Sequence, residues 1–120
     1  MNADEMKKRT RAFALRVIRL VEALPKVKTT DVIGKQLLRC GTSVGANYRA
    51  SCRAKLQADF IAKMGIVEEE WDGSLFGMEL LIASGRVKAE RLTNLMREGG
   101  EILAITVASI KTARRATSRP

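Results

Sequence analysis

The sequence predicts an all-α protein: an antiparallel, up-and-down four-helix bundle that forms a single domain over residues 1–120. Three observations lead to this prediction. Apolar residues recur every three or four positions in four segments of about 20–29 residues, which is the spacing of an amphipathic helix. The chain has 120 residues, of which 46% are hydrophobic and two are proline, so it can bury one core. No stretch of useful length alternates with period two, so no strand is expected.

The first helix is predicted over residues 4–24. Phe13, Val17 and Leu24 belong to an apolar stripe at helical spacing, and basic residues occupy much of the remaining surface. Pro25 should end this helix, because proline has no amide hydrogen and disfavours helical backbone in the residue before it.

The second helix is predicted over residues 30–53. Its N-cap should come from Thr29–Asp31, whose side chains can accept a hydrogen bond from a free backbone amide. Gly41 and Gly45 lie within this helix and lower its propensity. A packing reason is therefore expected, namely that another helix approaches the backbone closely at these two positions.

The third helix, residues 58–83, has the clearest period, because its apolar residues follow one another in steps of three or four. Ser84–Arg86 is predicted to be its C-terminal stop. The fourth helix is predicted to run continuously over residues 87–115. Gly99–Gly100 costs about 1 kcal/mol per glycine relative to alanine and marks the point where a kink is expected. The tail, Ala116–Pro120, is expected to fray.

Basic residues are the main functional signal. The chain has 22 Lys and Arg against 13 Asp and Glu, a net charge of +9 and a pI of about 10.2, which favours an acidic partner such as nucleic acid. Between Lys26 and Lys55 there are seven cations and one acidic residue. The candidate phosphate-binding residues are Lys26, Lys28, Lys35, Arg49, Arg53 and Lys55, with Arg11, Arg16 and Arg19 as a second set.

Contacts with the phosphate backbone are the expected mode of binding. Arginine binds phosphate through a fork of donors and lysine as a point charge, and such contacts weaken steeply with salt. Aromatic residues make up 4% of the chain, too few to favour stacking on single-stranded bases. The sequence leaves RNA and DNA equally open, and the simpler alternative is that the basic residues only keep a bundle soluble.

The absence of histidine excludes several classes of enzyme and metal site. His-based acid–base catalysis, Ser-His-Asp triads and His-containing zinc or di-iron sites require a residue that the chain lacks. Gly41–Gly45 matches the pattern G-x-S-x-G, but that motif needs a strand-to-helix turn and a histidine base. Glu68–Glu70 cannot converge on one ion, because successive helical residues point about 100° apart. No catalytic residue, metal or cofactor is expected, and the chain is predicted not to be an enzyme.

Two cysteines, Cys40 and Cys52, cannot form a disulfide framework, and on one helix they would lie about 18 Å apart. They are expected to be free thiols in a reducing compartment. No apolar run approaches the roughly 20 residues that span a bilayer, and Met1–Glu5 lacks the pattern of a signal peptide. A cytoplasmic protein without a membrane partner is expected.

A polar row lies beside the apolar stripe of the second helix; its members are Gln36, Arg39, Ser43 and Asn47. These residues are expected to organise the interior of the bundle or an interface between subunits. Arg39 is expected to form an ion pair between helices, with direct contact to a ligand as the alternative. The candidate partners for the ion pair are Glu68, Glu69 and Glu79.

The same region resembles a known family. The run from Gln36 to Asn47, QLLRCGTSVGAN, is similar to the signature of the small bacterial four helix bundle proteins, also known as 23S ribosomal RNA intervening-sequence proteins. Residues 58–66 and 107–113 are similar to the third and fourth helices of that family. The resemblance extends over residues 13–115, nearly the whole chain.

The resemblance implies a ring-like homo-oligomer, a homopentamer with a basic central channel. It also implies kinship with the accessory variability proteins of diversity-generating retroelements, which bind nucleic acid and a reverse transcriptase and have no catalytic activity. The predicted function is therefore that of a non-enzymatic, oligomeric accessory or scaffold protein that binds nucleic acid. The alternative is a protein–protein adaptor for a partner such as a reverse transcriptase. Leu15 and Ile18 lie outside the main stripe of the first helix and agree with assembly.

Overall fold

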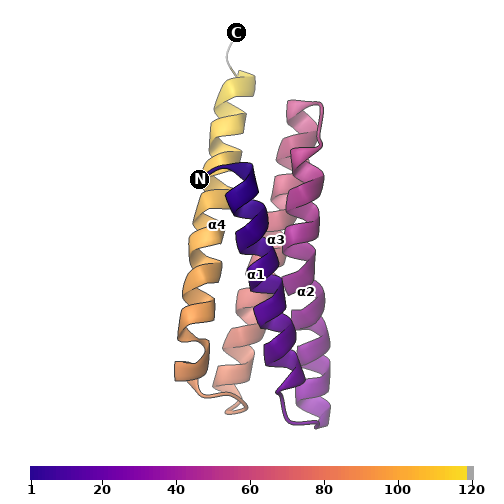
Figure 1. Ribbon diagram of the computed structural model, residues 1–120, viewed down its shortest axis with the longest axis vertical. Helices are drawn as coiled ribbons and strands as arrows, with labels where there is room; N and C mark the ends of the chain where they lie inside the picture. Colours follow the sequence, from indigo (N-terminus) through magenta and orange to yellow (C-terminus); the bar gives the residue numbers. More distant parts are fainter. Residues whose placement is uncertain (119–120) are drawn as a thin grey trace.

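The computed structural model describes residues 1–118 and consists of four helices joined by short turns. The helices are α1 (Ala3–Glu22), α2 (Lys28–Cys52), α3 (Gln57–Ala83) and α4 (Ala89–Ser118). Together they form a rod of 55 × 21 × 21 Å (Figure 1). Residues 1–118 contain no strand, so the prediction of an all-α, four-helix protein is confirmed.

Helices that follow one another in the chain pack side by side, and α4 also packs against α1. The α1–α2 and α3–α4 turns lie at one end of the rod, whereas the α2–α3 turn lies at the other end, beside the last turns of α4 (Figure 1). This arrangement brings the end of α1 to the α3–α4 turn, although the two segments are far apart in the sequence.

Helix α2 begins two residues earlier than predicted, and the predicted N-cap is wrong. Val27 occupies the N-cap position with an extended backbone. Thr30 stands in the first turn, where its Oγ1 accepts a hydrogen bond from the amide of Val27 at 3.3 Å and donates one to the carbonyl of Pro25. The amide of Val27 also donates to the carbonyl of Pro25 at 3.0 Å, so Thr30 holds the turn before α2 from inside the first turn of the helix rather than from a capping position before it.

Helix α3 ends in a Schellman motif. The amide of Arg86 donates to the carbonyl of Leu81 at 2.9 Å, and the amide of Gly85 donates to that of Ile82 at 3.0 Å. Gly85 has a φ of 76°, a left-handed conformation that favours glycine. The predicted stop at Ser84–Arg86 is thus confirmed, and it fixes the backbone that leads into α4.

Helix α4 is unbroken and starts at Ala89, two residues later than predicted. A Cβ atom at Gly99 would lie 3.2 Å from Leu75 Cδ2 and 3.4 Å from the ring of Trp71, so glycine lets α3 and α4 approach closely here. The helix continues to Ser118, three residues beyond the prediction. The remainder of the predicted frayed tail, residues 119–120, lies outside the described residues.

The core is centred on Trp71 of α3, which is fully buried. Its ring centroid lies 4.3 Å from that of Phe13 in α1, with the two planes inclined by 60°. The indole Nε1 is buried and has no hydrogen-bond partner. Trp71 therefore contributes through packing, at the cost of one unsatisfied donor.

Candidate nucleic-acid interface

The two basic helices α1 and α2 are held together at glycines. A Cβ atom at Gly41 would lie 2.9 Å from Val17 Cγ1, and one at Gly45 would lie 3.2 Å from Thr10 Oγ1. The contact at Gly41 is closer than Cβ atoms make in proteins, and the contact at Gly45 is tighter than most, so glycine at both positions favours this close separation of the helices. The prediction that another helix approaches closely at Gly41 and Gly45 is confirmed.

A groove of about 310 Å³ runs between α1 and α2 at this close approach. Arg11 of α1 and Arg49 of α2 both line it, together with small or uncharged residues that include Thr42 and Ala46. Both arginines are exposed, and no acidic residue lines the groove. The structure thus brings together one residue from each predicted basic set.

The end of the rod that carries the α2–α3 turn is also basic. Arg53 and Lys55 line a hollow of about 580 Å³ with Lys63, a residue that was not predicted from the sequence, and with one acidic residue, Asp59. No sequence pattern singles out Lys63, because it lies on the next helix and only the turn brings it back towards Arg53. Arg49 precedes Arg53 by one helical turn, so this group continues the groove along α2.

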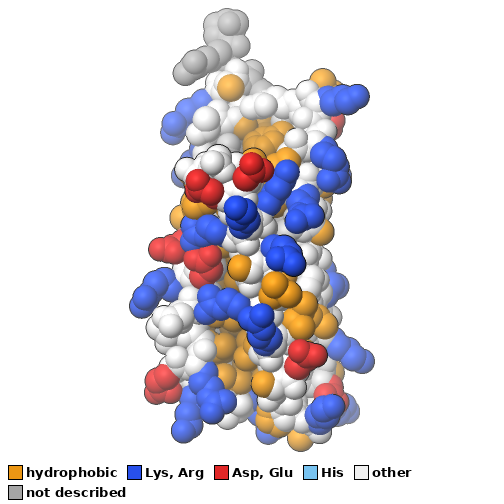
Figure 2. All heavy atoms as spheres, viewed as in Figure 1, with side chains coloured by type: hydrophobic (Ala, Val, Ile, Leu, Met, Phe, Trp, Pro, Cys, Tyr) orange, Lys and Arg blue, Asp and Glu red, His pale blue; other side chains and the backbone are white. Residues whose placement is uncertain are grey.

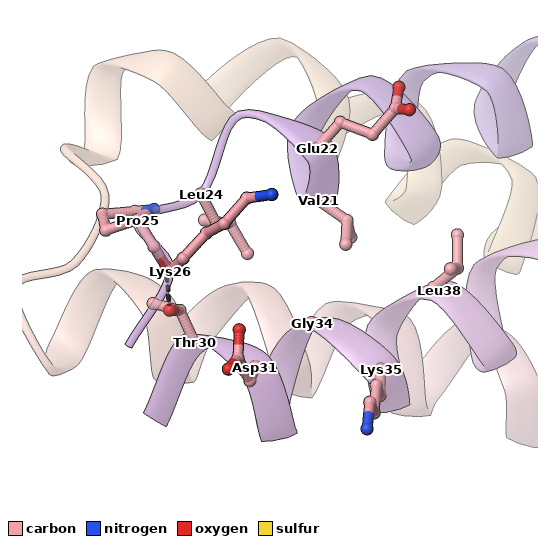
Figure 3. A pocket seen from close by; sticks show the side chains of 10 residues that line it. All are labelled: Val21, Glu22, Leu24, Pro25, Lys26, Thr30, Asp31, Gly34, Lys35 and Leu38. Carbon is pink, nitrogen blue, oxygen red and sulfur yellow. Dashed lines mark hydrogen bonds between the residues drawn. The ribbon is translucent and has the colours of Figure 1, made fainter. Parts of the chain in front are cut away.

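The predicted residues Lys26 and Lys35 lie in a different environment, at the opposite end of the rod. They line a hollow of about 460 Å³ between α1 and α2, together with the acidic residues Glu22 and Asp31 (Figure 3). Figure 3 shows Asp31 pointing into the space between the two helices, whereas Lys35 points away from it. Basic and acidic side chains balance here, so this hollow is less suited to phosphate than the groove.

The remaining predicted cations do not join either group. Lys28 is exposed at the first position of α2, and Arg19 is exposed near the end of α1. Arg16 lies close enough to Glu98 of α4 to help lower the pKa of that carboxyl, which places Arg16 on the α4 side of α1. Figure 2 shows Lys and Arg side chains spread over the visible face of α1 and α2, with fewer acidic side chains among them.

Arg39 makes an ion pair between helices, but with a partner that was not expected. Its Nη1 lies 3.3 Å from Oε2 of Glu70, and its Nη2 lies 3.2 Å from the sulfur of Cys40. Glu70 is the half-buried member of the acidic run on α3, whereas Glu68 and Glu69 are exposed. The expected partners Glu68, Glu69 and Glu79 are therefore corrected to Glu70, because helical rotation turns only Glu70 towards α2.

The other members of the polar row do not lie in the interior of the bundle. Gln36 is exposed, and Ser43 and Asn47 are half-buried. The side-chain amide of Asn47 donates to the backbone carbonyl of Ser43 at 2.9 Å, within the same helix. The row thus follows the surface of α2 on the side of α3, as the contact between Arg39 and Glu70 shows.

A forked ion pair joins α1 to α4 and was not predicted from the sequence. Arg9 Nε donates to Oε2 of Glu98 at 2.9 Å, and its Nη2 contacts both Glu98 and Glu101. The hydrogen bond from Arg9 is the main reason why the pKa of Glu98 is lowered, and the same bond raises the pKa of Arg9. No local pattern signals a pair that is 89 residues apart.

The motif G-x-S-x-G, which is typical of catalytic serines, does not form a catalytic arrangement here. Ser43 lies within α2 rather than at a strand-to-helix turn, so the match forms no nucleophile elbow. Residues 1–118 hold no group of three potential ligands that could bind a metal ion. Both cysteines are free, and burial raises the pKa of the Cys40 thiol. Within the same residues, no helix is long and apolar enough to cross a membrane.

Comparison with known proteins identifies the fold and the family. Residues 3–108 match the family model of the 23S rRNA-intervening sequence protein. A crystal structure of a protein with unknown function from the S23 ribosomal protein family of Bacteroides thetaiotaomicron is similar to this chain, with 32% sequence identity and a TM-score of 0.85. The similarity covers 92% of this chain and 99% of that one. No curated protein matches the chain. The chain therefore belongs to the family of 23S rRNA-intervening sequence proteins.

Proposed function

We propose that the chain is a non-enzymatic, basic scaffold protein that binds the phosphates of RNA or DNA. The observation that carries this proposal is the groove between α1 and α2, where Arg11 and Arg49 meet from two helices and no acidic residue lines the wall. Two guanidinium groups beside one groove can hold phosphates of a strand, each through a fork of donors.

The neighbouring residues would extend this contact. Arg53, Lys55 and Lys63 follow Arg49 towards the α2–α3 turn and share their hollow with a single carboxylate. Contacts of this kind position a nucleic acid without reading its sequence, and they weaken as salt rises. We therefore expect little preference for sequence.

The distribution of charge among the helices supports a directed contact rather than general solubility. Helix α3 has six acidic residues and one basic residue, whereas the chain as a whole carries a net charge of +9. The positive excess is thus confined to α1, α2, α4 and the turns. A polyanion would be attracted to these elements and repelled from the outer face of α3.

We further propose that this up-and-down bundle assembles as a ring-like homo-oligomer, with five copies as the number that the family resemblance implies. Val32 of α2 is 58% exposed, and Phe76 of α3 is 59% exposed. Gly77 packs against Leu37, so Phe76 lies on the part of α3 that packs against α2, the helix that carries Val32. Exposed apolar residues on two adjacent helices favour burial by a second copy, and unlike surfaces that meet head to tail can close a ring.

The same surface favours a second candidate function. An acidic helix with exposed apolar residues, such as Phe76 and Leu80, is suited to a protein partner rather than to phosphates. The chain would then be an adaptor for a partner such as a reverse transcriptase, with incidental affinity for nucleic acid. A specific protein that stays bound after nuclease treatment would favour this alternative.

The test is fluorescence-anisotropy binding of short RNA and DNA duplexes across a salt series. Replacing Arg11 and Arg49 together with alanine should weaken binding. It should also flatten the plot of log affinity against log salt by about 0.9 for each phosphate that is no longer neutralised. The double variant Lys26→Ala/Lys35→Ala removes the same charge from the balanced hollow and serves as the control.

Two outcomes would contradict the proposal. If the wild-type protein binds neither duplex at low salt, the adaptor becomes the better explanation. If the control variant loses as much affinity as Arg11→Ala/Arg49→Ala, binding depends on net charge alone and the groove has no special role.

A further inference from the structure

Another hollow lies where the end of α1 meets the α3–α4 turn. Its charged residues are all basic, whereas the hollow beside Lys26 has two basic and two acidic side chains. The hollow at the α3–α4 turn has a volume of about 340 Å³. One part of its wall is apolar and consists of Leu20, Leu24, Pro25 and Val87. The charged part consists of Arg86, Lys88 and Arg91.

The fold gives this hollow a fixed backbone on both sides. The Schellman motif at Gly85 sets the direction of Arg86 and Val87, and the amide of Arg91 donates to the carbonyl of Lys88 at 3.0 Å in the first turn of α4. On the other side, the chain turns at Pro25 while Leu24 is buried in the core. The three cations are thus presented by ordered turns rather than by a loose segment.

The charge in this hollow is not compensated. No acidic residue lines it, and among residues 1–118 no ion pair involves Arg86, Lys88 or Arg91. Glu90 lines a neighbouring hollow that Lys88 also borders. The hollow beside Lys26, at the same end of the rod, contains two carboxylates and so provides an internal comparison.

We propose that this hollow binds one nucleotide unit, with its phosphate on Arg86, Lys88 and Arg91 and its base or sugar against the apolar wall formed by Leu20, Pro25 and Val87. Guanidinium forks and an ammonium group fit phosphate oxygens, and the volume lies near the lower end of the range of small-molecule sites, about 300–1,000 Å³. A paired base is covered by its neighbours in a duplex, so the nucleotide should be unpaired.

This inference rests on the proposed function, because both take phosphates of nucleic acid as the ligand. From Arg11 in the groove to Ala23 at the hollow, α1 rises about 18 Å. That span is about five steps of 3.4 Å along one strand. Along the rod, a short single-stranded end could therefore reach from a duplex in the groove to the level of the hollow.

The experiment compares a blunt 12-base-pair RNA duplex with the same duplex carrying a three-nucleotide overhang, in anisotropy titrations at fixed salt. We expect the overhang to tighten binding by the wild-type protein about tenfold. Arg86→Ala/Arg91→Ala should abolish this gain and leave the affinity for the blunt duplex nearly unchanged. Lys26→Ala/Lys35→Ala, which removes the same charge at the same end of the rod, should retain the gain. Circular dichroism checks that each variant stays helical.

The outcomes separate the two proposals. A wild-type protein that binds the blunt duplex through Arg11 and Arg49 but gains nothing from the overhang would overturn the hollow alone. Failure to bind any duplex would instead overturn the proposed function. Titration with adenosine monophosphate tests whether the hollow binds a free nucleotide as well as the end of a strand. Binding of adenosine monophosphate that is lost in Arg86→Ala/Arg91→Ala supports the hollow as a nucleotide site. Equal loss of the overhang gain in both double variants would contradict the inference.

Discussion

The guanidinium of Arg9 in α1 holds the carboxylate of Glu98 in α4 through two of its nitrogens, and it also reaches Glu101 at 3.1 Å. These two helices come from opposite ends of the chain and have less contact with each other than the other neighbouring pairs. A forked, partly buried ion pair is stronger than an exposed one. Arg9 and Glu98 therefore join the two neighbouring helices that have the least contact with each other.

This ion pair should make the free energy of unfolding depend on pH in the acid range. The hydrogen bond from Arg9 lowers the pKa of Glu98 in the folded state. The ion pair therefore stabilises the fold fully above the ordinary pKa of 4.5, and this stabilisation is lost as the pH falls through the lower folded-state pKa. Glu98→Gln should reduce the free energy of unfolding by about 1–2 kcal/mol at pH 7, and the difference from wild type should shrink in acid. Urea denaturation at several pH values measures this difference in the free energy of unfolding.

Glu79→Gln is the control for this prediction, because Glu79 is exposed on α3 and forms no ion pair among residues 1–118. Its effect on the free energy of unfolding should stay within about 0.5 kcal/mol. A Glu98→Gln variant with the same acid dependence as the wild type would show that the pair does not stabilise the fold.

Adding a methyl group at Gly41 should destabilise the bundle. The new Cβ would meet both Cγ atoms of Val17, at 2.9 and 3.0 Å, and valine cannot rotate away because its side chain is branched. We expect Gly41→Ala to cost about 1–3 kcal/mol, as overpacking does. Gly100→Ala, where no atom lies within 4 Å, should instead stabilise α4 by up to about 1 kcal/mol. Similar melting temperatures for the two variants would contradict the close approach of α1 and α2.

Charging the exposed surface of α3 should disrupt the proposed assembly without unfolding the helices. Phe76 is 59% exposed, so Phe76→Glu loses little core packing and places a charge at the seam with α2. Light scattering should show a smaller particle than the wild type, with unchanged helical content. Ala104→Glu, which adds the same charge to an exposed position of α4, should keep the wild-type size. A wild-type protein that is already monomeric would refute the proposed ring.

Because the buried indole Nε1 of Trp71 has no hydrogen-bond partner, two substitutions of this residue should differ in their effect on stability. Trp71→Ala should cost about 3–5 kcal/mol, because it leaves a large cavity beside Phe13. Trp71→Phe should cost much less, since it keeps most of the ring and removes a buried donor that has no acceptor. Unfolding in urea, followed by circular dichroism, compares the two. Equal losses would mean that Nε1 has a partner in solution.

Local chemistry made the elements of this fold predictable from the sequence. Pro25 and Gly85 act through their own backbones, so the end of α1 and the stop of α3 could be placed within a few residues. The N-cap of α2 was misplaced because the hydroxyl of Thr30 acts from inside the first turn, and a sequence pattern does not distinguish that position from the position before the helix.

Four amphipathic helices, a basic chain without histidine, and glycines that face another helix could all be predicted from the order of the residues. Which charges are neighbours became apparent in the folded bundle. It placed Arg11 beside Arg49, balanced Lys26 and Lys35 with two carboxylates, and turned Glu70 rather than Glu68 towards Arg39. The reason is physical: helical periodicity fixes where a side chain lies on its own helix, whereas the partner across a groove depends on how two helices rotate and slide against each other.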